Sequence, residues 1–372
     1  MGLPADFGRE VYLSRIESVR AMLRQTGIAA IAETPGAGLR YLTGTWLERH
    51  ERLACLLLPA EGAPTLICPA MDREIVAAGP GAVETIRYLT AEDDPLRIIT
   101  EILREAGHAE GRVGVSSGTT YDEFASVHAM LPKLNFVSTS ALVGSLRERK
   151  SPQEVAILKA SAAIAQRAID RSLKEAREGM REFELATILD AHVRALGARP
   201  GGCQVLFGAR TAVHRLPTGE AALTSGAVVA ITCSPDVHGY RAPIARSAIM
   251  GKTTGRMRMI HEALRDAQQA ALERARPGGV RNSVHQVARA AVTSRGFPEF
   301  PHPLGHGAGL ESSEAPHLSL GDYALLVEGG VATLTPSVQT PGEYGIRIGD
   351  LMELTASSSR WLSQPPRQMV EL

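Results

Sequence analysis

A strong helix-start signal near the middle of the chain most constrains how its 372 residues can fold. Ser151 can cap a helix with its hydroxyl, Pro152 suits the first helical turn, and Glu154 stands three residues after the cap. Apolar residues with helical spacing follow from residue 153 to about residue 178. At about 100–200 residues per domain, the length corresponds to two domains or three. We therefore predict a boundary before this helix, with domains at residues 1–148 and 149–372.

The first domain alternates helical and extended patterns. Apolar residues recur on one face between Tyr12 and Thr26, as in an amphipathic helix, and a short buried strand is predicted at residues 28–32. The other predicted elements are strands at 53–58, 64–68 and 112–116 and a helix at 96–106. This alternation predicts a small α/β domain.

The second domain combines helix pairs with meandering strands. After the helix that begins near Pro152, helices are predicted at 182–196, 257–274 and 283–295, and extended segments at 203–207, 227–233 and 245–250. The last hundred or so residues are extended and rich in turns. Helix pairs and strands in this order predict an antiparallel sheet covered by helices, so the fold class is α+β.

The overall composition excludes several partners. Forty basic and forty acidic residues give a formal net charge of +0, which provides no field to attract nucleic acid or an acidic membrane. No apolar run approaches the roughly 18–20 residues that span a bilayer, and the first residues lack the pattern of a secretory signal. The four cysteines are widely scattered. We therefore expect a cytoplasmic protein with reduced thiols that binds a small molecule.

Three short segments of the second domain hold the candidate chemistry. His214 lies in a polar loop before a strand, where the alternative is a solvent-exposed loop histidine. His302 and His306 stand four residues apart among Gly305, Gly307 and Gly309, which suggests a closely approached backbone with both imidazoles aimed at one space. The alternative there is a glycine-rich turn with surface histidines. The third segment runs from residue 228 to residue 241.

Together these segments resemble the pita-bread family of methionine aminopeptidase, aminopeptidase P, prolidase and creatinase. The resemblance is carried by Gly239-Tyr240-x-x-Pro243-x-x-Arg246, by Gly305-His306-Gly307-Ala308-Gly309-Leu310-Glu311-Ser312-Ser313-Glu314-Ala315-Pro316, by Gly345-Ile346-Arg347-Ile348-Gly349-Asp350 and, in the first domain, by Leu39-Arg40-Tyr41-Leu42-Thr43-Gly44. It implies a small N-terminal creatinase-like domain followed by a C-terminal pita-bread domain, an antiparallel sheet covered by helix pairs.

The chain departs from this family where the family binds metal. The family's metalloenzymes hold two ions with two aspartates, one histidine and two glutamates, and the matching positions here are Thr232, Pro243, His306, Thr335 and Gly349. One imidazole cannot replace that ligand set. We therefore expect no metal and no other cofactor. Without a Lewis acid an unactivated peptide bond is a hard substrate, so we also expect that the protein is not a peptidase.

Within the family, the strand pair is most similar to that of creatinase, which works without metal. Thr232-Cys233-Ser234-Pro235 fits its pattern, and His214 falls where creatinase has a histidine that acts as general base and acid. His306 matches a second active-site histidine. Ala245 and Thr335 stand where creatinase grips a guanidinium with glutamates, so a guanidinium substrate is disfavoured.

The resemblance therefore leads to a metal-independent, creatinase-like hydrolase of a C–N bond in a small carboxylate-bearing molecule, with His214 and His306 as acid/base catalysts. Arg52, Tyr240, His302 and Arg347 are the expected substrate-binding residues, although Tyr240 could equally be a packed strand tyrosine. Creatinase-like members dimerise, so we expect a homodimer in which the partner's N-terminal domain completes the site and supplies Arg52. The alternatives are a lyase, cyclase or isomerase that uses the same histidines, and an inactive binding protein.

Overall fold

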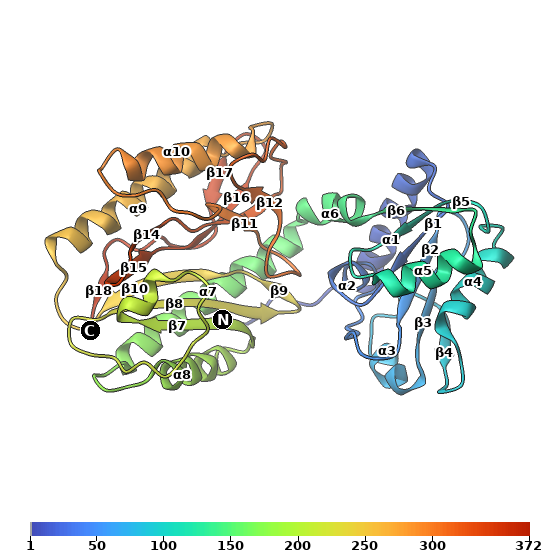
Figure 1. Cartoon of the computed structure of the whole chain (residues 1–372), viewed down its shortest axis with the longest axis horizontal. Coiled ribbons are helices and arrows are strands. Elements are labelled where there is room, and N and C mark those ends of the chain that lie inside the picture. Colours follow the sequence, from blue (N-terminus) through green and yellow to red (C-terminus); the bar gives the residue numbers. More distant parts are fainter. Residues whose placement is uncertain (1) are drawn as a thin grey trace. The chain divides into compact units, whose positions relative to one another are not determined.

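The computed structural model describes residues 2–372, which form two compact units (Figure 1). The N-terminal unit comprises residues 5–147. The C-terminal unit comprises residues 148–372 together with the chain segment up to Pro4.

The N-terminal unit is built on one six-stranded sheet with the strand order β4-β3-β2-β1-β5-β6. Its strands are β1 (Ala30–Glu33), β2 (Cys55–Pro59), β3 (Thr65–Pro69), β4 (Thr85–Leu89), β5 (Gly111–Val115) and β6 (Leu134–Ser138). Strands β1, β5 and β6 run parallel, whereas β2 is antiparallel to both β1 and β3. Its helices are α1 (Arg9–Thr26), α2 (Ala37–Thr43), α3 (Arg73–Ala77), α4 (Pro95–Glu105), α5 (Tyr121–Met130) and α6 (Ser140–Glu148). The predicted α/β character of this region is confirmed.

The C-terminal unit begins with the helix that the sequence predicts most clearly, α7 (Pro152–Glu175). The Glu154 backbone N–H donates to Ser151 Oγ at 3.3 Å, and the Ser151 N–H donates to Glu154 Oε2 at 2.8 Å. Two backbone donors at the start of the helix are thus satisfied by side chains. The predicted helix start is confirmed.

The strands of the C-terminal unit form two larger sheets and a hairpin. The first sheet has the order β18-β10-β8-β7, with β9 paired to β8, and the second has the order β12-β11-β13-β16-β17. The bounds of the first are β7 (Arg199–Phe207), β8 (Val228–Val237), β9 (Tyr240–Arg241), β10 (Ile244–Ile249) and β18 (Val370–Glu371). Those of the second are β11 (Gly305–Gly307), β12 (Glu314–Leu318), β13 (Val331–Leu334), β16 (Asp350–Leu354) and β17 (Ser359–Trp361). The hairpin consists of β14 (Ser337–Thr340) and β15 (Tyr344–Arg347).

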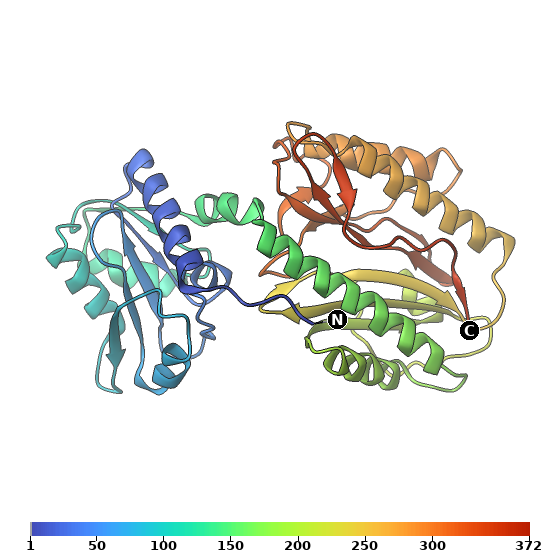
Figure 2. The same ribbon diagram turned by 180° about the vertical axis from the view of Figure 1, so that it is seen from behind.

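Two helix pairs cover these sheets, as Figures 1 and 2 show. Helices α7 and α8 (Glu182–Ala195) pack on the first sheet. Helices α9 (Gly255–Arg274) and α10 (Arg281–Thr293) bury Ile260, Leu264 and Val284 in a core shared with Leu334 and Met352 of the second sheet. This is the predicted antiparallel arrangement covered by helix pairs, and the α+β pita-bread expectation is confirmed.

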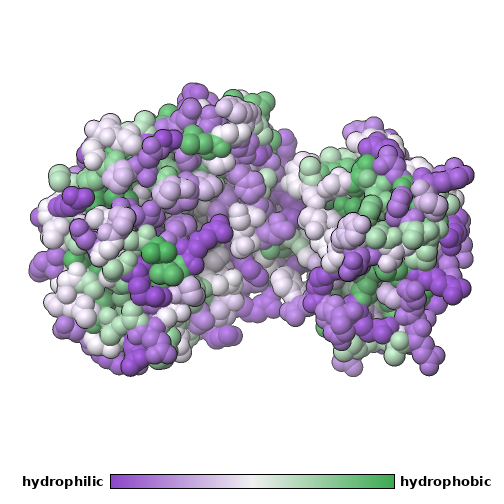
Figure 3. Space-filling model, in the orientation of Figure 1, coloured by the Kyte–Doolittle hydropathy of each residue, from purple (hydrophilic) through white to green (hydrophobic). Residues whose placement is uncertain are grey.

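On the face drawn in Figure 3, hydrophilic and hydrophobic side chains are intermixed, and the hydrophobic ones lie in small groups. Within residues 2–372, no helix combines the length and the apolar character that a membrane span requires. The four cysteines are not joined by disulfides.

Candidate active site

A cavity of about 490 Å³ lies in the C-terminal unit, between strands β7, β8 and β10 of one sheet and strands β11 and β15. His214, His302, His306 and Arg347, four of the predicted site residues, all line it. The fifth basic lining residue is Arg215. The fold thus gathers at one place residues that are up to 133 positions apart in the sequence (347 minus 214).

The loop that carries His214 is fixed at both ends by one buried carboxylate. Glu182, at the start of α8, is fully buried and accepts hydrogen bonds from the Phe207 N–H at 2.8 Å and the Gly219 N–H at 2.7 Å. It also accepts from Arg210 Nε at 3.0 Å. Since Phe207 and Gly219 flank the loop, the Glu182 carboxylate holds the loop in one conformation.

His214 and His302 form a stacked pair. Their ring centroids lie 4.2 Å apart, and the rings are 18° from parallel. His302 Nε2 lies 2.7 Å from Ser337 Oγ and its Nδ1 lies 2.8 Å from the Pro303 carbonyl oxygen, so both of its nitrogens are engaged. His214 Nδ1, in contrast, is buried and has no hydrogen-bond partner among residues 2–372. A buried unpaired polar atom beside a cavity is a contact that a ligand can complete.

Burial lowers the pKa of His214 to about 3, and the nearby His302, Arg347 and Arg215 add to this effect. Burial also lowers the pKa values of His302 and His306 below 6.5. These imidazoles are therefore neutral at neutral pH. A group with a pKa near 3 is a weak base at pH 7, so the expected role of His214 in acid/base catalysis loses its physical basis.

Arg347 is buried with only 5% of its surface exposed. Its Nη1 donates to Gln204 Oε1 at 3.0 Å, whereas its Nη2 has no hydrogen-bond partner in the described part of the chain. Burial lowers its pKa to about 10, which still leaves the guanidinium charged at neutral pH. The group is thus a buried cation with a free donor at the cavity. It can bind a carboxylate.

His306 stands on β11, where the glycines of its segment allow close backbone packing. A Cβ on Gly305 would lie 1.7 Å from the Thr333 carbonyl oxygen, and one on Gly307 would lie 2.1 Å from that of Ala315. The glycines therefore serve strand packing and not a surface turn, which was the alternative for this segment. His306 Nδ1 lies 3.1 Å from the Gly307 carbonyl oxygen.

The positions that match the family's metal ligands come together around this cavity, but their side chains do not suit a metal pair. Thr232 pairs with Ala245, and the Gly349 N–H donates to the Ala245 carbonyl oxygen. A Cβ on Gly349 would lie 2.9 Å from Thr335 Oγ1. Throughout residues 2–372, no group of three or more His, Cys, Asp or Glu residues could hold a metal ion. Two hydroxyls and one imidazole do not fit a dinuclear centre.

Two predicted substrate-binding residues lie outside the cavity. Tyr240 is 3% exposed and its hydroxyl donates to Glu154 Oε1 at 2.8 Å, so it is the packed strand tyrosine of the alternative interpretation. The assignment of Tyr240 to substrate binding is corrected, because its ring packs against α7 instead of facing the cavity.

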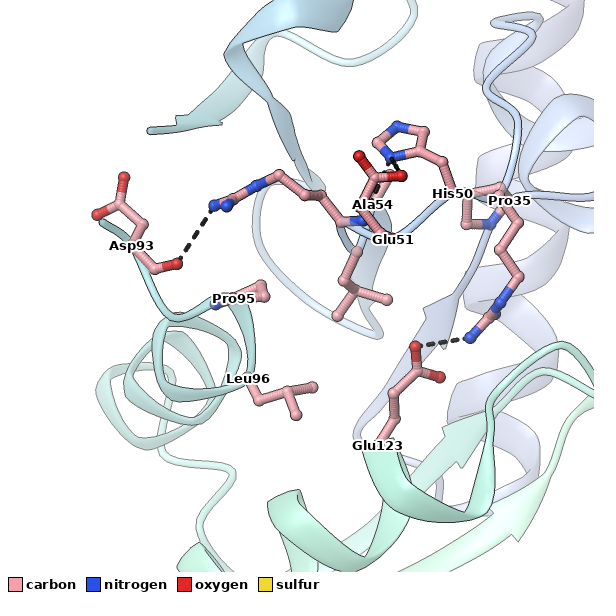
Figure 4. Close-up of a pocket in the computed structure, with 11 residues that line it drawn as sticks. Pro35, His50, Glu51, Ala54, Asp93, Pro95, Leu96 and Glu123 are labelled. Carbon is pink, nitrogen blue, oxygen red and sulfur yellow. Dashed lines mark hydrogen bonds and ion pairs between the residues drawn. The ribbon is translucent and has the colours of Figure 1, made fainter. Parts of the chain in front are cut away.

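Arg52 belongs to a separate pocket of about 250 Å³ in the N-terminal unit (Figure 4). Its guanidinium donates to the carbonyl oxygens of Thr90, Ala91 and Asp93 in the same unit. These bonds engage Arg52 Nη1 and Nη2 within its own domain. The role of Arg52 in a partner's site stays a prediction.

Sequence reasoning missed three residues that shape the cavity: Gln204, Arg215 and Ser337. Gln204 orients Arg347, and Ser337 bonds His302. Arg215 directly follows His214, and a charged neighbour of a candidate loop histidine was a signal that could have found it. Gln204 and Ser337 carry no such signal, because only the sheet registers bring them to the cavity.

Comparison with known proteins identifies the family. Residues 156–356, more than half of the chain, match metallopeptidase family M24. This chain belongs to that family. Residues 15–149 also match the Creatinase/Prolidase N-terminal domain. The pita-bread resemblance drawn from the motifs is therefore confirmed.

Individual relatives of this M24 member are dipeptidases. The structure of dipeptidase PepE from Mycobacterium ulcerans is 26% identical, with a TM-score of 0.91 and coverage of 99% of each chain. A dipeptidase from Pyrococcus horikoshii is 28% identical, with a TM-score of 0.89 and coverage of 96% of this chain and 100% of its own. The Xaa-Pro dipeptidase of Lactobacillus delbrueckii subsp. lactis is 26% identical over 91% of this chain and 94% of its own.

These relatives contradict the functional expectation drawn from the missing ligands. We expected a metal-independent hydrolase with histidine acid/base catalysis that is not a peptidase, whereas the M24 relatives are dipeptidases of a metallopeptidase family. The expectation was wrong because it took the loss of ligand side chains as loss of the family's substrate class. The less specific expectation, a hydrolase that acts on a C–N bond, is confirmed, because the chain belongs to a family of peptidases and these hydrolyse C–N bonds.

Proposed function

We propose that this protein acts on a dipeptide, or on a peptide-like molecule of that size, bound in the cavity with its terminal carboxylate on Arg347. The observation that carries the proposal is Nη2 of Arg347, a buried cation that lines the cavity, because the residues that the structure describes provide no partner for this donor. A carboxylate can satisfy this donor and the charge together.

Two further observations support a ligand of this size. A cavity of about 490 Å³ lies within the roughly 300–1,000 Å³ of pockets that bind small molecules. Three relatives of similar length and fold are named as dipeptidases, which favours a dipeptide as the substrate class.

The test compares a dipeptide with its C-terminal amide. Gln-Ala and Gln-Ala amide differ only in the terminal carboxylate, and binding of each is measured by calorimetry. Free alanine or alanine amide is then sought by mass spectrometry, in buffer with EDTA and in buffer with Mn²⁺ or Zn²⁺. We expect the acid to bind about tenfold or more tightly than the amide, because a charge-assisted hydrogen bond is lost in the amide.

Three outcomes are informative. Preferred binding of the acid, with release of alanine, supports the proposal. Equal binding of the two compounds, or no binding of either at millimolar concentration, overturns it. Binding of the acid without release of alanine in any buffer overturns the proposal that the protein cleaves the dipeptide. It still supports the proposal that the cavity recognises the terminal carboxylate.

A homodimer remains part of this proposal. The prediction is supported by the family resemblance, and light scattering coupled to size-exclusion chromatography tests it. A mass near twice 39.7 kDa is the expected result, and a monomer at micromolar concentration contradicts it.

A further inference from the structure

The cavity has an unusual balance of charge for a site in a peptidase fold. Three histidines and two arginines line it, and no aspartate or glutamate is found among its lining residues in the described chain. The two arginines are Arg215 and Arg347. With the histidines neutral, the lining carries two fixed positive charges and no negative one.

Neither arginine is neutralised by the protein. Arg347 contacts Gln204, a neutral side chain, and the only cause of its lowered pKa is burial. Arg215 is exposed and makes no ion pair within residues 2–372. A buried cation normally has a paired anion, so the counter-charge of Arg347 is missing from this site, and Arg215 adds a second, exposed positive charge.

The neutral polar groups of the cavity also suit an anion. Thr232, Ser312 and Thr335 present hydroxyls to the cavity. A hydroxyl can donate a hydrogen bond to a carboxylate oxygen. Thr232 and Thr335 therefore add neutral hydrogen-bond donors and no negative charge to the cavity.

We propose that the cavity selects a substrate with two anionic groups, such as a short peptide with an acidic side chain. This inference rests on the proposed function and adds the substrate class. One carboxylate binds Arg347, and the second binds Arg215 with the hydroxyls nearby. A cationic side chain on the substrate adds a positive charge that meets no counter-charge in the cavity, so basic peptides should bind more weakly than acidic ones.

The experiment compares ligands that differ by one charge. Glu-Ala and Gln-Ala have nearly the same shape, and Lys-Ala reverses the charge. Glutarate and its monoamide, glutaramate, repeat the comparison without a peptide bond. Calorimetry at pH 7 and low salt should give Glu-Ala binding about tenfold or more tighter than Gln-Ala, with Lys-Ala the weakest. Glutarate should likewise bind more tightly than glutaramate.

The outcomes separate this inference from the proposed function. If Gln-Ala binds as tightly as Glu-Ala, the dianion inference fails and dipeptide recognition stands. If only glutarate binds, and more tightly than glutaramate, the dianion inference stands and the proposed function fails. If no ligand binds, both fail.

A pair of variants tests the residue assignment. Arg215→Gln should reduce the preference for Glu-Ala over Gln-Ala at least about fivefold, because the second carboxylate loses its cation. Arg215 is exposed, so this change should leave the fold intact. The matched control is Arg194→Gln, an exposed arginine of α8 outside the cavity, which should keep the full preference. An unchanged preference in Arg215→Gln overturns the assignment.

Discussion

The His214 and His302 rings stack at 4.2 Å beside the unpaired guanidinium nitrogen of Arg347. Two protonated imidazoles at this distance would repel each other and the guanidinium. Burial lowers the pKa values of both rings, and Arg347 adds to the effect on each. Both imidazoles are therefore neutral, and the Arg347 guanidinium is the buried positive charge of this cluster. A bound anion would neutralise that charge.

The buried imidazoles make stability dependent on pH. The pKa of His214 is lowered to about 3 and that of His261 to about 4, with burial the main cause in each. At pH values between these lowered pKa values and 6.5, the two histidines are protonated in the unfolded chain and neutral in the folded chain. The free energy of unfolding is therefore highest above about pH 6.5 and falls as the pH falls.

Thermal denaturation followed by circular dichroism checks this prediction. The Tm should be nearly constant from pH 8 to pH 7 and should fall between pH 6.5 and pH 5, before most carboxylates titrate. Replacing His261 by Gln should make the slope shallower. A Tm that is constant or rises between pH 6.5 and pH 5 contradicts the prediction.

Anion binding should be nearly independent of pH between pH 6.5 and pH 8. The pKa of His214 is lowered to about 3 by burial and by the nearby His302, Arg347 and Arg215, so its ring stays neutral in this range. Arg347, whose pKa is lowered only to about 10, remains charged and binds the anion. Calorimetry with glutarate in two buffers with different ionisation enthalpies should therefore measure almost no proton uptake. Uptake of a full proton at pH 7 would contradict the prediction, because it would show that an imidazole becomes protonated beside the anion.

Glu182 is predicted to position the His214 loop. In Glu182→Gln one oxygen still accepts hydrogen bonds, but the charge that pairs with Arg210 is lost. The free energy of unfolding should fall by about 1–3 kcal/mol. Binding of Gln-Ala should weaken as the loop loosens. Urea denaturation measures the first effect, and Glu178→Gln, whose side chain is exposed and bonds only the Ser225 N–H, is the control with a change below about 0.5 kcal/mol.

Gly307→Ala tests the close packing of β11. The added Cβ would meet the Ala315 carbonyl oxygen, which is backbone and cannot turn away. Stability should fall by about 1–3 kcal/mol, as expected for overpacking. Gly255→Ala, at the start of α9 with open space around its Cα, should be neutral or slightly stabilising. Equal Tm values for the two variants would contradict the packing explanation.

Local signals in the sequence predict much of this fold. The Ser151 and Glu154 pair marks the start of α7 within the sequence itself, since a capping box needs only residues three positions apart. Strands β4 and β6 were missed because they are the edges of their sheet and are only partly buried, which leaves no apolar run to detect.

The site was less predictable, and for a tertiary reason. The motifs indicated His214, His302, His306 and Arg347, but the stack of His214 on His302 depends on two segments that meet only in the folded chain. The depressed pKa of His214 follows from that burial, so the sequence value near 6.5 suggested a base that the structure does not provide. Tyr240 was assigned to the substrate although its motif also fits a strand that packs on α7.

The central claim is that Arg347 holds the terminal carboxylate of the substrate. Calorimetric titration of Gln-Ala into Arg347→Gln tests it most directly, with Arg194→Gln as the control and circular dichroism as the check on folding. We predict that Arg347→Gln binds about 10- to 100-fold more weakly and unfolds at the same or a higher temperature, because an unpaired buried cation is removed. Affinity equal to that of the wild type in a folded Arg347→Gln variant would contradict the account.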